Sequence, residues 1–232
     1  FPMTNAKQIK QVFGPLAAQY NDLKQIGSHY LWLLPVRHVA LRVLIDRSSH
    51  KDFCTPRWTM LETFIPGSDL MTSIGHSGYL HRPASSRVVE WIWSDPTMIE
   101  DLLSVIATVA LPRLRAIDSL PAFWTVYSDG TDIKVPQWPE MRLIFHIALG
   151  DLDAARALYE TLEPELRENR YPNLPWIQGR RRMVLSVAEP LLASDRAALA
   201  TILHGWEADN VRGTKLEPYW ERTPFPLEAA SA

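Results

Sequence analysis

Three strand-like runs follow one another between residues 30 and 65, and no helical pattern separates them. The runs cover residues 30–34, 36–46 and 58–65, are rich in Val, Ile, Leu, Trp and Thr, and are joined by polar stretches that contain proline. Parallel strands need a long crossover between them, commonly a helix. Strands joined this closely therefore predict an antiparallel sheet.

The second of these runs alternates along its length. Val39 and Val43 share one face of the strand, whereas His38 and Arg42 share the other. This alternation predicts one buried face and one largely solvated face. A further strand, at which the sheet ends, is predicted at residues 87–93.

A helix is predicted ahead of the sheet, over residues 5–26. Its apolar residues recur at steps of three and four, namely Ile9, Val12, Phe13, Leu16, Tyr20 and Leu23. Pro15 has no N–H to donate and its ring crowds the preceding turn, so we expect a kink or break there. Gly27 is expected to close the helix.

The chain becomes mostly helical after Asp95–Pro96, a dipeptide that favours a helix start. A small hairpin is predicted around Asp129–Gly130, with strands at residues 124–127 and 133–135. The helices expected after it cover residues 141–149, 152–166, 176–192 and 195–210. The tail over residues 217–226 contains three prolines among its aromatic residues, so we expect it to be extended and to pack back onto the protein.

Together these patterns predict an α+β fold. A kinked N-terminal helix lies on an antiparallel sheet, and a mostly helical C-terminal half follows. The expected division is an α+β sheet domain over residues 1–94 and a mostly helical region with the small hairpin over residues 95–232, with the two packed as one unit.

The composition narrows the class of protein. The chain has 232 residues, of which 47% are apolar and 22% charged, as in ordinary globular proteins. Its 24 Lys and Arg nearly balance its 26 Asp and Glu, which argues against nucleic-acid binding. The single cysteine indicates a reducing compartment, so we expect a cytoplasmic protein. No apolar run reaches the length of about 20 residues that spans a bilayer, so no membrane association is expected.

No motif predicts catalysis. Residues Gly75–Tyr79 approach the Gly-x-Ser-x-Gly nucleophile elbow around Ser77, but Tyr79 stands where the second glycine belongs, so we predict a plain loop. His76 and His81 lack the spacing and partners of a metal site. A glycine-rich phosphate loop is also missing. The sequence therefore predicts no catalytic residue, no cofactor and no metal ligand.

Two features favour a binding surface instead. The chain has nine Trp, a residue common at interaction hot spots, and a run of three arginines. Successive helical residues point about 100° apart, so a solvated face is the plain reading of this run. The candidate partner-binding residues are Arg180, Arg181, Arg182 and, in the tail, Trp220.

Two stretches resemble known families. Residues 11–16, 24–27 and 30–32 resemble the start of a large group of bacterial α+β domains of unknown function, over about the first 90 residues. Members of such groups resemble immunity or accessory proteins encoded beside toxins, which implies partner binding without catalysis. Residues 148–155 resemble the inter-helix turn of tetratricopeptide-like proteins, although one copy implies only a local helical hairpin.

The functional expectation is a cytoplasmic bacterial protein that binds a protein partner without catalysis. It is expected to act as an immunity or accessory protein that blocks a toxin or regulates its partner. One alternative is a hydrolase of an unfamiliar family, using Ser77 or a His–carboxylate site assembled in the fold. Another is an oligomeric scaffold. The sequence leaves the partner's identity and the oligomeric state open.

Overall fold

The computed structural model describes residues 4–47, 52–129, 138–169 and 171–229. Its centre is one five-stranded antiparallel sheet in the order β1-β2-β3-β4-β5. The strands are β1 (Leu23–Gln25), β2 (Tyr30–Leu33), β3 (Val39–Arg47), β4 (Cys54–Glu62) and β5 (His76–Tyr79). Each strand pairs with the next in the chain. From β1 to β4 the connections are too short for the crossover that a parallel pair needs. The predicted antiparallel sheet and α+β class are confirmed.

The last strand is not where the sequence places it. Residues 87–93 do not form a strand, and only an isolated bridge joins Ile92 to Phe53. The edge strand is instead β5, in the segment predicted to be a loop. Gly78 makes this pairing possible, because a Cβ on it would lie 2.4 Å from the indole of Trp58 on the neighbouring strand.

Helix α1 (Ala6–Gln19) is shorter than predicted and runs without a break through Pro15. Its start is fixed by a capping box in which the Asn5 side chain accepts from Gln8 N–H and the Gln8 side chain accepts from Asn5 N–H. The predicted helix over 5–26 is wrong at its end, because Leu23 turns into β1 and pairs opposite Leu33. Gly27 lies in the β1–β2 turn with φ +81°.

A second long helix crosses a proline in a different way. It comprises α2 (Met98–Val105), a π-helical segment η1 (Ile106–Ala110) and α3 (Leu111–Arg115). Leu111 N–H bonds to Ile106 O in the widened turn. Pro112 cannot donate to the carbonyl four residues earlier, and the wider turn ahead of it lets the helix continue.

The remaining helices are α4 (Leu120–Asp129), α5 (Pro139–Leu149), α6 (Leu152–Glu168), α7 (Pro175–Leu192) and α8 (Arg196–Val211). The predicted hairpin is wrong at residues 124–127, which lie in α4; residues 133–135 fall outside the described residues. Phe123 and Tyr127, one helical turn apart, both stack on Phe145 of α5, so burial overrides their strand propensity. The predicted α5–α6 helical hairpin is present, with Gly150 left-handed and Asp151 capping Ala154 N–H.

The tail after α8 is held along the protein. We call residues 217–229 the C-terminal strap; it contains the short turns η2 (Glu217–Tyr219) and η3 (Pro226–Glu228). Val36 N–H donates to Tyr219 O at 2.9 Å, and Glu221 N–H donates to Val36 O at 2.8 Å. Phe225 is only 1% exposed, so the predicted packing of the tail is confirmed.

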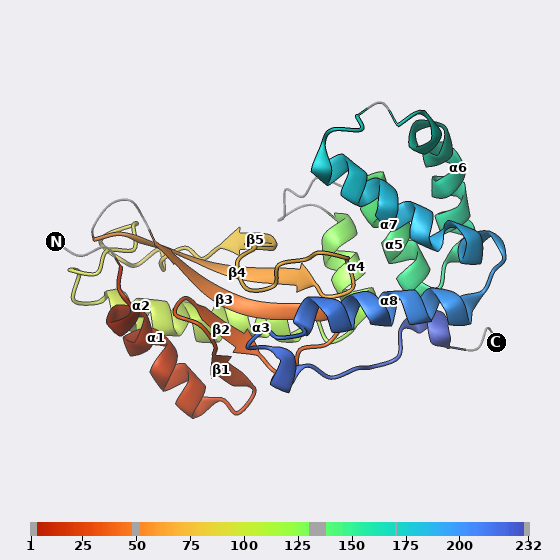
Figure 1. Ribbon diagram of the computed structural model, residues 1–232. Coiled ribbons are helices and arrows are strands. Elements are labelled where there is room, and N and C mark those ends of the chain that lie inside the picture. Colours follow the sequence, from red (N-terminus) through yellow and green to blue (C-terminus); the bar gives the residue numbers. More distant parts are fainter. Residues whose placement is uncertain (1–3, 48–51, 130–137, 170, 230–232) are drawn as a thin grey trace.

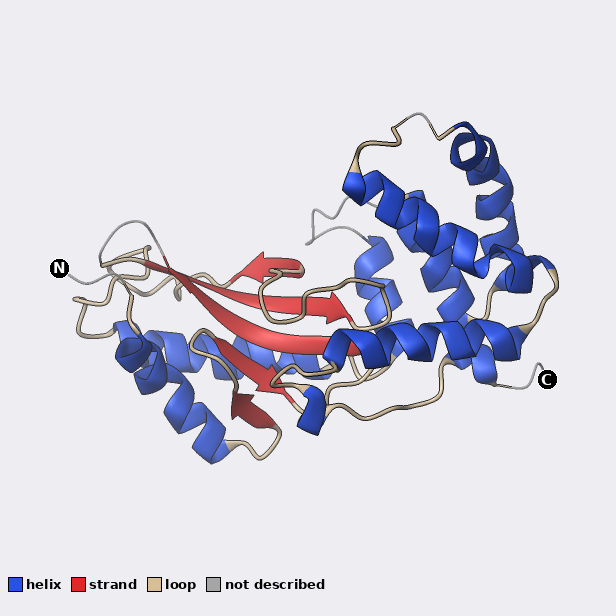
Figure 2. Cartoon of the chain, in the orientation of Figure 1, coloured by secondary structure: helices blue, strands red, loops and turns tan. Residues whose placement is uncertain are grey.

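Figures 1 and 2 show how these elements are arranged. Helices α1, α2 and α3 lie along one side of the sheet, and α5, α6 and α7 gather at one end of the molecule. A single apolar core extends from Ile9 of α1 to Leu227 of the strap, so the sheet and the C-terminal helices share it. No helix in the described ranges has both the length and the apolar character needed to cross a membrane.

The predicted solvated face of β3 is also wrong. Ala40 and Arg42 are fully buried and Leu44 is nearly so. The β4–β5 connection and the residues around α8 cover this face, where a smaller apolar cluster includes Trp32, Leu70 and Leu216. A strand buried on both faces can hold a polar residue only if that residue is hydrogen-bonded, as Arg42 is to Thr59 Oγ1 and Leu70 O.

Candidate functional site

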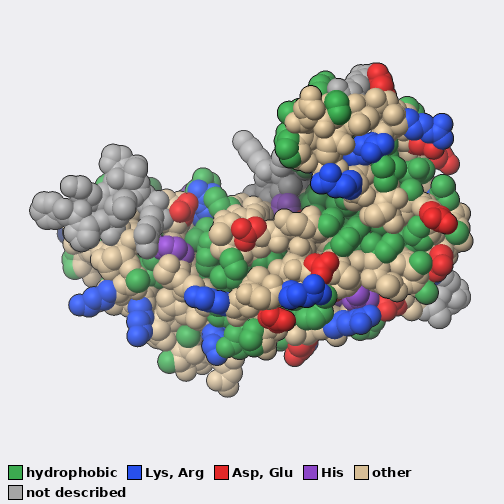
Figure 3. All heavy atoms as spheres, in the orientation of Figure 1, with side chains coloured by type: hydrophobic (Ala, Val, Ile, Leu, Met, Phe, Trp, Pro, Cys, Tyr) green, Lys and Arg blue, Asp and Glu red, His purple; other side chains and the backbone are tan. Residues whose placement is uncertain are grey.

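A groove lies where the β4–β5 connection meets the C-terminal helices. Its volume is about 620 Å³. We call it the Trp–Arg groove, and its main lining residues are Ile65, Met141, Trp176, Arg180, Arg182, Met183 and Trp206. In the view of Figure 3, apolar side chains gather between the sheet and the α5–α7 helices, with Lys or Arg side chains at their edge.

Two tryptophans and an arginine meet beside this groove; Trp176 and Arg180 line it, and Trp138 contacts both of them. Trp138 directly precedes the first residue of α5, and Trp176 lies in the first turn of α7. Their ring centroids are 6.2 Å apart. The Cζ of Arg180, one turn further along α7, lies 3.5 Å from the Trp138 centroid and 4.9 Å from that of Trp176. The rings thereby hold the guanidinium by cation–π stacking at the protein surface.

The two indoles remain open to solvent. Trp138 is 39% exposed and Trp176 is 53% exposed. Tyr171 and Leu174, which precede α7, are exposed as well. Monomeric proteins rarely leave several large apolar side chains together in water unless the surface serves an interaction.

The side chains of the three successive arginines lie in different environments. Arg180 and Arg182 line the groove, whereas Arg181 donates through Nε to Leu166 O at 2.8 Å, at the end of α6. Trp220 lies elsewhere, half-buried against the smaller apolar cluster with its Nε1 buried. The structure thus brings together two of the four predicted binding residues. Sequence reasoning missed Trp138 and Trp176, whose only signal is a tryptophan beside a helix-starting proline.

A second candidate site is a buried network of histidines and glutamates. Glu207 of α8 is fully buried. Its carboxylate accepts from Thr63 Oγ1 at 2.8 Å, from His38 Nδ1 at 2.8 Å and from His204 Nδ1 at 3.3 Å. His204 Nε2 also donates to Glu228 of the strap at 2.8 Å. These contacts tie the β2–β3 and β4–β5 connections to the Glu207 carboxylate of α8, and His204 links the strap to α8 through Glu228.

His38 borders a pocket of about 700 Å³ between the β2–β3 connection, the α3–α4 connection and the strap. A histidine oriented by a buried carboxylate is the arrangement of a general base. However, its Nε2 lies 3.2 Å from Pro224 O and 3.2 Å from Thr223 Oγ1. Both of these neighbours belong to the strap, so Nε2 is engaged inside the protein whichever ring nitrogen carries the proton. The Phe225 ring, 3.9 Å from the His38 centroid, covers the imidazole.

The strap carboxylate of this network is itself constrained. Burial acts to raise the pKa of Glu228, but the hydrogen bonds from Phe225 N–H and His204 outweigh it and hold the pKa below its usual range. In the described part of the chain, no group of three or more His, Cys, Asp or Glu residues is arranged to hold a metal ion. The network therefore fastens the strap to the body.

The residues of the predicted loop are dispersed. His76 of β5 binds Glu62 of β4 and packs on the rings of Phe123 and Tyr127. Burial, and then the charge of Glu62, raises the pKa of Tyr127 to about 12. Ser77 lies opposite Thr59 in the sheet, and His81 is exposed, so neither joins this pair.

The lone cysteine lies in surroundings that favour its neutral thiol. Cys54 is buried, and burial together with the Asp52 charge raises its pKa to about 12. The thiol therefore stays protonated at neutral pH.

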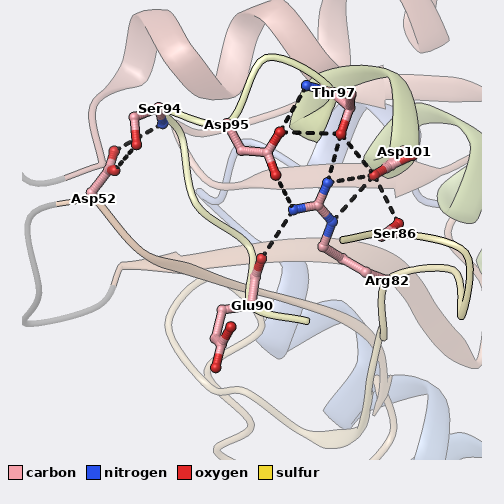
Figure 4. A network of polar contacts seen from close by, with 8 residues as sticks. All are labelled: Asp52, Arg82, Ser86, Glu90, Ser94, Asp95, Thr97 and Asp101. Atoms are coloured by element: carbon pink, nitrogen blue, oxygen red, sulfur yellow. Dashed lines mark hydrogen bonds and ion pairs between the residues drawn. The ribbon is translucent and has the colours of Figure 1, made fainter. Parts of the chain in front are cut away.

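A third polar cluster surrounds Arg82, as Figure 4 shows. Its guanidinium donates to Asp95 at 2.7 Å, to Asp101, to Thr97 at 2.9 Å and to the carbonyl of Glu90 at 3.3 Å. The Arg82 side chain is 1% exposed. Every nitrogen has an acceptor, so the cluster pins the β5–α2 connection to the start of α2 and leaves nothing for a ligand.

Comparison of the chain with family models, with curated proteins and with solved structures finds no match. A proposal of function therefore rests on the sequence and the sites of this chain.

Proposed function

We propose that this protein acts by stoichiometric, non-catalytic binding of a partner protein through the Trp–Arg groove. The observation that carries the proposal is the Arg180 guanidinium lying against the exposed rings of Trp138 and Trp176. Trp and Arg are the residues most enriched at interaction hot spots. Stacking also fixes their rotamers before binding, which lowers the entropy lost when a complex forms.

The kind of partner follows from the sequence resemblance to immunity and accessory proteins. Such a protein would occupy a functional surface of a toxin, or regulate its partner, and would need no nucleophile or acid–base pair. This agrees with the position of the polar clusters, whose members face one another and not the groove.

A hydrolase is the alternative of another class. Ser77 lies in a paired edge strand without a histidine bonded to it, within the described residues. His38 has the orienting carboxylate, but its Nε2 is engaged by Thr223 and Pro224 of the strap. The geometry therefore favours binding. An oligomeric scaffold is the remaining alternative, and sedimentation of the pure protein decides it.

The test is recovery of a partner from cells in which the protein is native. Tagged wild-type protein is expected to retain a stoichiometric partner, and Trp138→Ala/Trp176→Ala is expected to weaken the complex about thirtyfold, the equivalent of about 2 kcal/mol. The control Ser77→Ala/His81→Ala should retain the partner as the wild type does. Equal recovery by wild type and the double Trp variant would contradict the proposal.

A further inference from the structure

The Trp–Arg groove carries positive charge that the described part of the protein leaves unpaired. Among the described residues, the side chains of Arg180 and Arg182 form no ion pair and donate no hydrogen bond, and no carboxylate lines the groove. Glu140, in the first turn of α5, is not one of the lining residues. The N-terminal ends of α5 and α7, brought together at Trp138 and Trp176, add the positive ends of two helix dipoles.

The way Arg180 is held leaves its binding capacity intact. The Trp138 ring lies closest to the guanidinium, and the distances between the three groups place the Trp176 ring to one side of it and not on its opposite face, so the two indoles do not enclose the N–H groups. A planar fork of donors fits a carboxylate through two parallel hydrogen bonds. The rings also exclude water from one side of that contact, which strengthens it relative to an exposed ion pair.

The floor beside the arginines is apolar. Ile65, Met141, Met183 and Trp206 line the same groove, and Met side chains adapt to the shape of an apolar group. The groove therefore presents a cation next to an apolar surface. Its complement is a carboxylate next to a large apolar side chain.

We infer that the groove docks a segment of a partner protein in which Asp or Glu residues alternate with large apolar or aromatic residues. This inference rests on the proposed function and names the chemistry of its partner. Single-stranded nucleic acid also stacks on Trp and pairs with Arg. Against it, the chain has a formal charge of −2, so a phosphate backbone gains no net attraction to the protein.

The experiment uses a random poly(Glu,Tyr) copolymer as the probe, with poly-Glu and oligo(dT) as comparisons. Binding to the full chain is followed by tryptophan fluorescence and calorimetry. We expect saturable binding of poly(Glu,Tyr), weaker binding of poly-Glu and none of oligo(dT). Affinity should fall as salt rises from about 50 to about 500 mM, because the contact is between charges.

Arg180→Gln/Arg182→Gln is expected to lower the affinity for the copolymer about tenfold or more, the equivalent of about 1.4 kcal/mol of binding free energy. The matched control is Arg167→Gln/Arg212→Gln, which removes two charges from side chains that are 77% and 70% exposed. Arg182→Gln alone removes a side chain that no described residue binds, so it keeps the test valid if the double variant is less stable. Arg180→Lys should recover less than half of the lost affinity, because an ammonium lacks the planar fork.

Three results would overturn the inference. They are no binding of poly(Glu,Tyr), equal loss in the groove and control variants, and binding of oligo(dT) that depends on Arg180. If the double Trp variant loses its cellular partner while the copolymer does not bind, the proposed function stands and this inference alone fails. If the double Trp variant keeps its partner, the proposed function fails.

Discussion

The guanidinium groups of Arg82 and Arg180 lie in environments that differ in how their N–H groups are used. Arg82 is enclosed, and two carboxylates, a hydroxyl and a carbonyl accept its protons. Arg180 is stacked on two exposed rings, and no acceptor for its protons lies among the described residues. An arginine whose donors are filled inside the protein supports the fold. An arginine that is held in place but whose N–H groups have no acceptor is available to a partner.

Arg42 occupies a third environment that sharpens this contrast. It also stacks on two rings, those of Tyr30 and Trp32, but it is fully buried and its donors reach Thr59 and the carbonyls of Leu70 and Ser73. Burial lowers its pKa to about 10. Stacking alone therefore does not mark a binding site. What distinguishes Arg180 is stacking together with open donors.

The largest effect is expected where a filled cluster loses its centre. Glu207→Ala leaves the Thr63 hydroxyl and two imidazoles without their common acceptor, so we expect a loss of about 3–5 kcal/mol of unfolding free energy. Urea denaturation followed by circular dichroism measures it. Glu207→Gln keeps the size and shape of the side chain, so its loss of unfolding free energy should be smaller. A loss below about 1 kcal/mol for the alanine variant would show that the network does not fasten the strap.

A somewhat smaller effect is expected at the apolar anchor of the strap. Phe225 stacks on His38 and meets the edge of Phe64 at 5.6 Å. Phe225→Ala should lower the unfolding free energy by about 3 kcal/mol, because the strap cannot move far enough to fill the cavity that the ring leaves. Hydrogen exchange should then show the Val36–Tyr219 and Val36–Glu221 bonds opening first. Unchanged protection of those amides would contradict a strap held by Phe225.

The stability that the Arg82 cluster contributes should depend on pH. Hydrogen bonds from Thr97 N–H and Arg82 lower the pKa of Asp95, and the bond from Arg82 lowers that of Asp101. Depressed carboxylate pKa values give stability that is complete above the ordinary Asp pKa of about 3.9 and is lost as pH falls through the folded-state values. The difference in urea midpoint between wild type and Arg82→Met should therefore be large at neutral pH and shrink toward pH 3. A difference independent of pH would show that packing, and not charge, is the role of Arg82.

The smallest effect is expected from the open arginines. Arg180→Gln/Arg182→Gln removes no internal ion pair among the described residues, so the unfolding free energy should change by no more than about 0.5 kcal/mol beyond the lost stacking. Thermal melting compares it with Arg167→Gln/Arg212→Gln. A drop as large as that of Arg82→Met would place Arg180 among the structural arginines.

The sequence predicted the elements whose signal is local. The antiparallel sheet followed from closely spaced strands, and α5 to α8 lie within two residues of the ranges expected from the sequence. The errors came where distant residues decide the outcome. Residues 124–127 have strand propensity but form a helix because Phe123 and Tyr127 pack on α5, and β5 depends on Gly78 meeting Trp58 across the sheet.

The candidate site was predictable only in part, for the same reason. Arg180 and Arg182 stood out as a charge run, but Trp138 is separated from them by more than 40 positions and reaches Arg180 only because α5 and α7 begin side by side. The Glu207 network gathers His38, His204 and Glu228 from separate segments. No spacing in the sequence could reveal either assembly.

The contrast between filled and open arginines is tested most directly by NMR of the side chains. The Nε–H resonances of arginine and the indole N–H resonances of tryptophan are followed in a proton–nitrogen spectrum during titration with poly(Glu,Tyr). We predict that the signals of Arg180, Arg182, Trp138 and Trp176 shift, while those of Arg42 and Arg82 stay in place. Shifts at Arg82 or Arg42 without shifts at Arg180 would contradict the account.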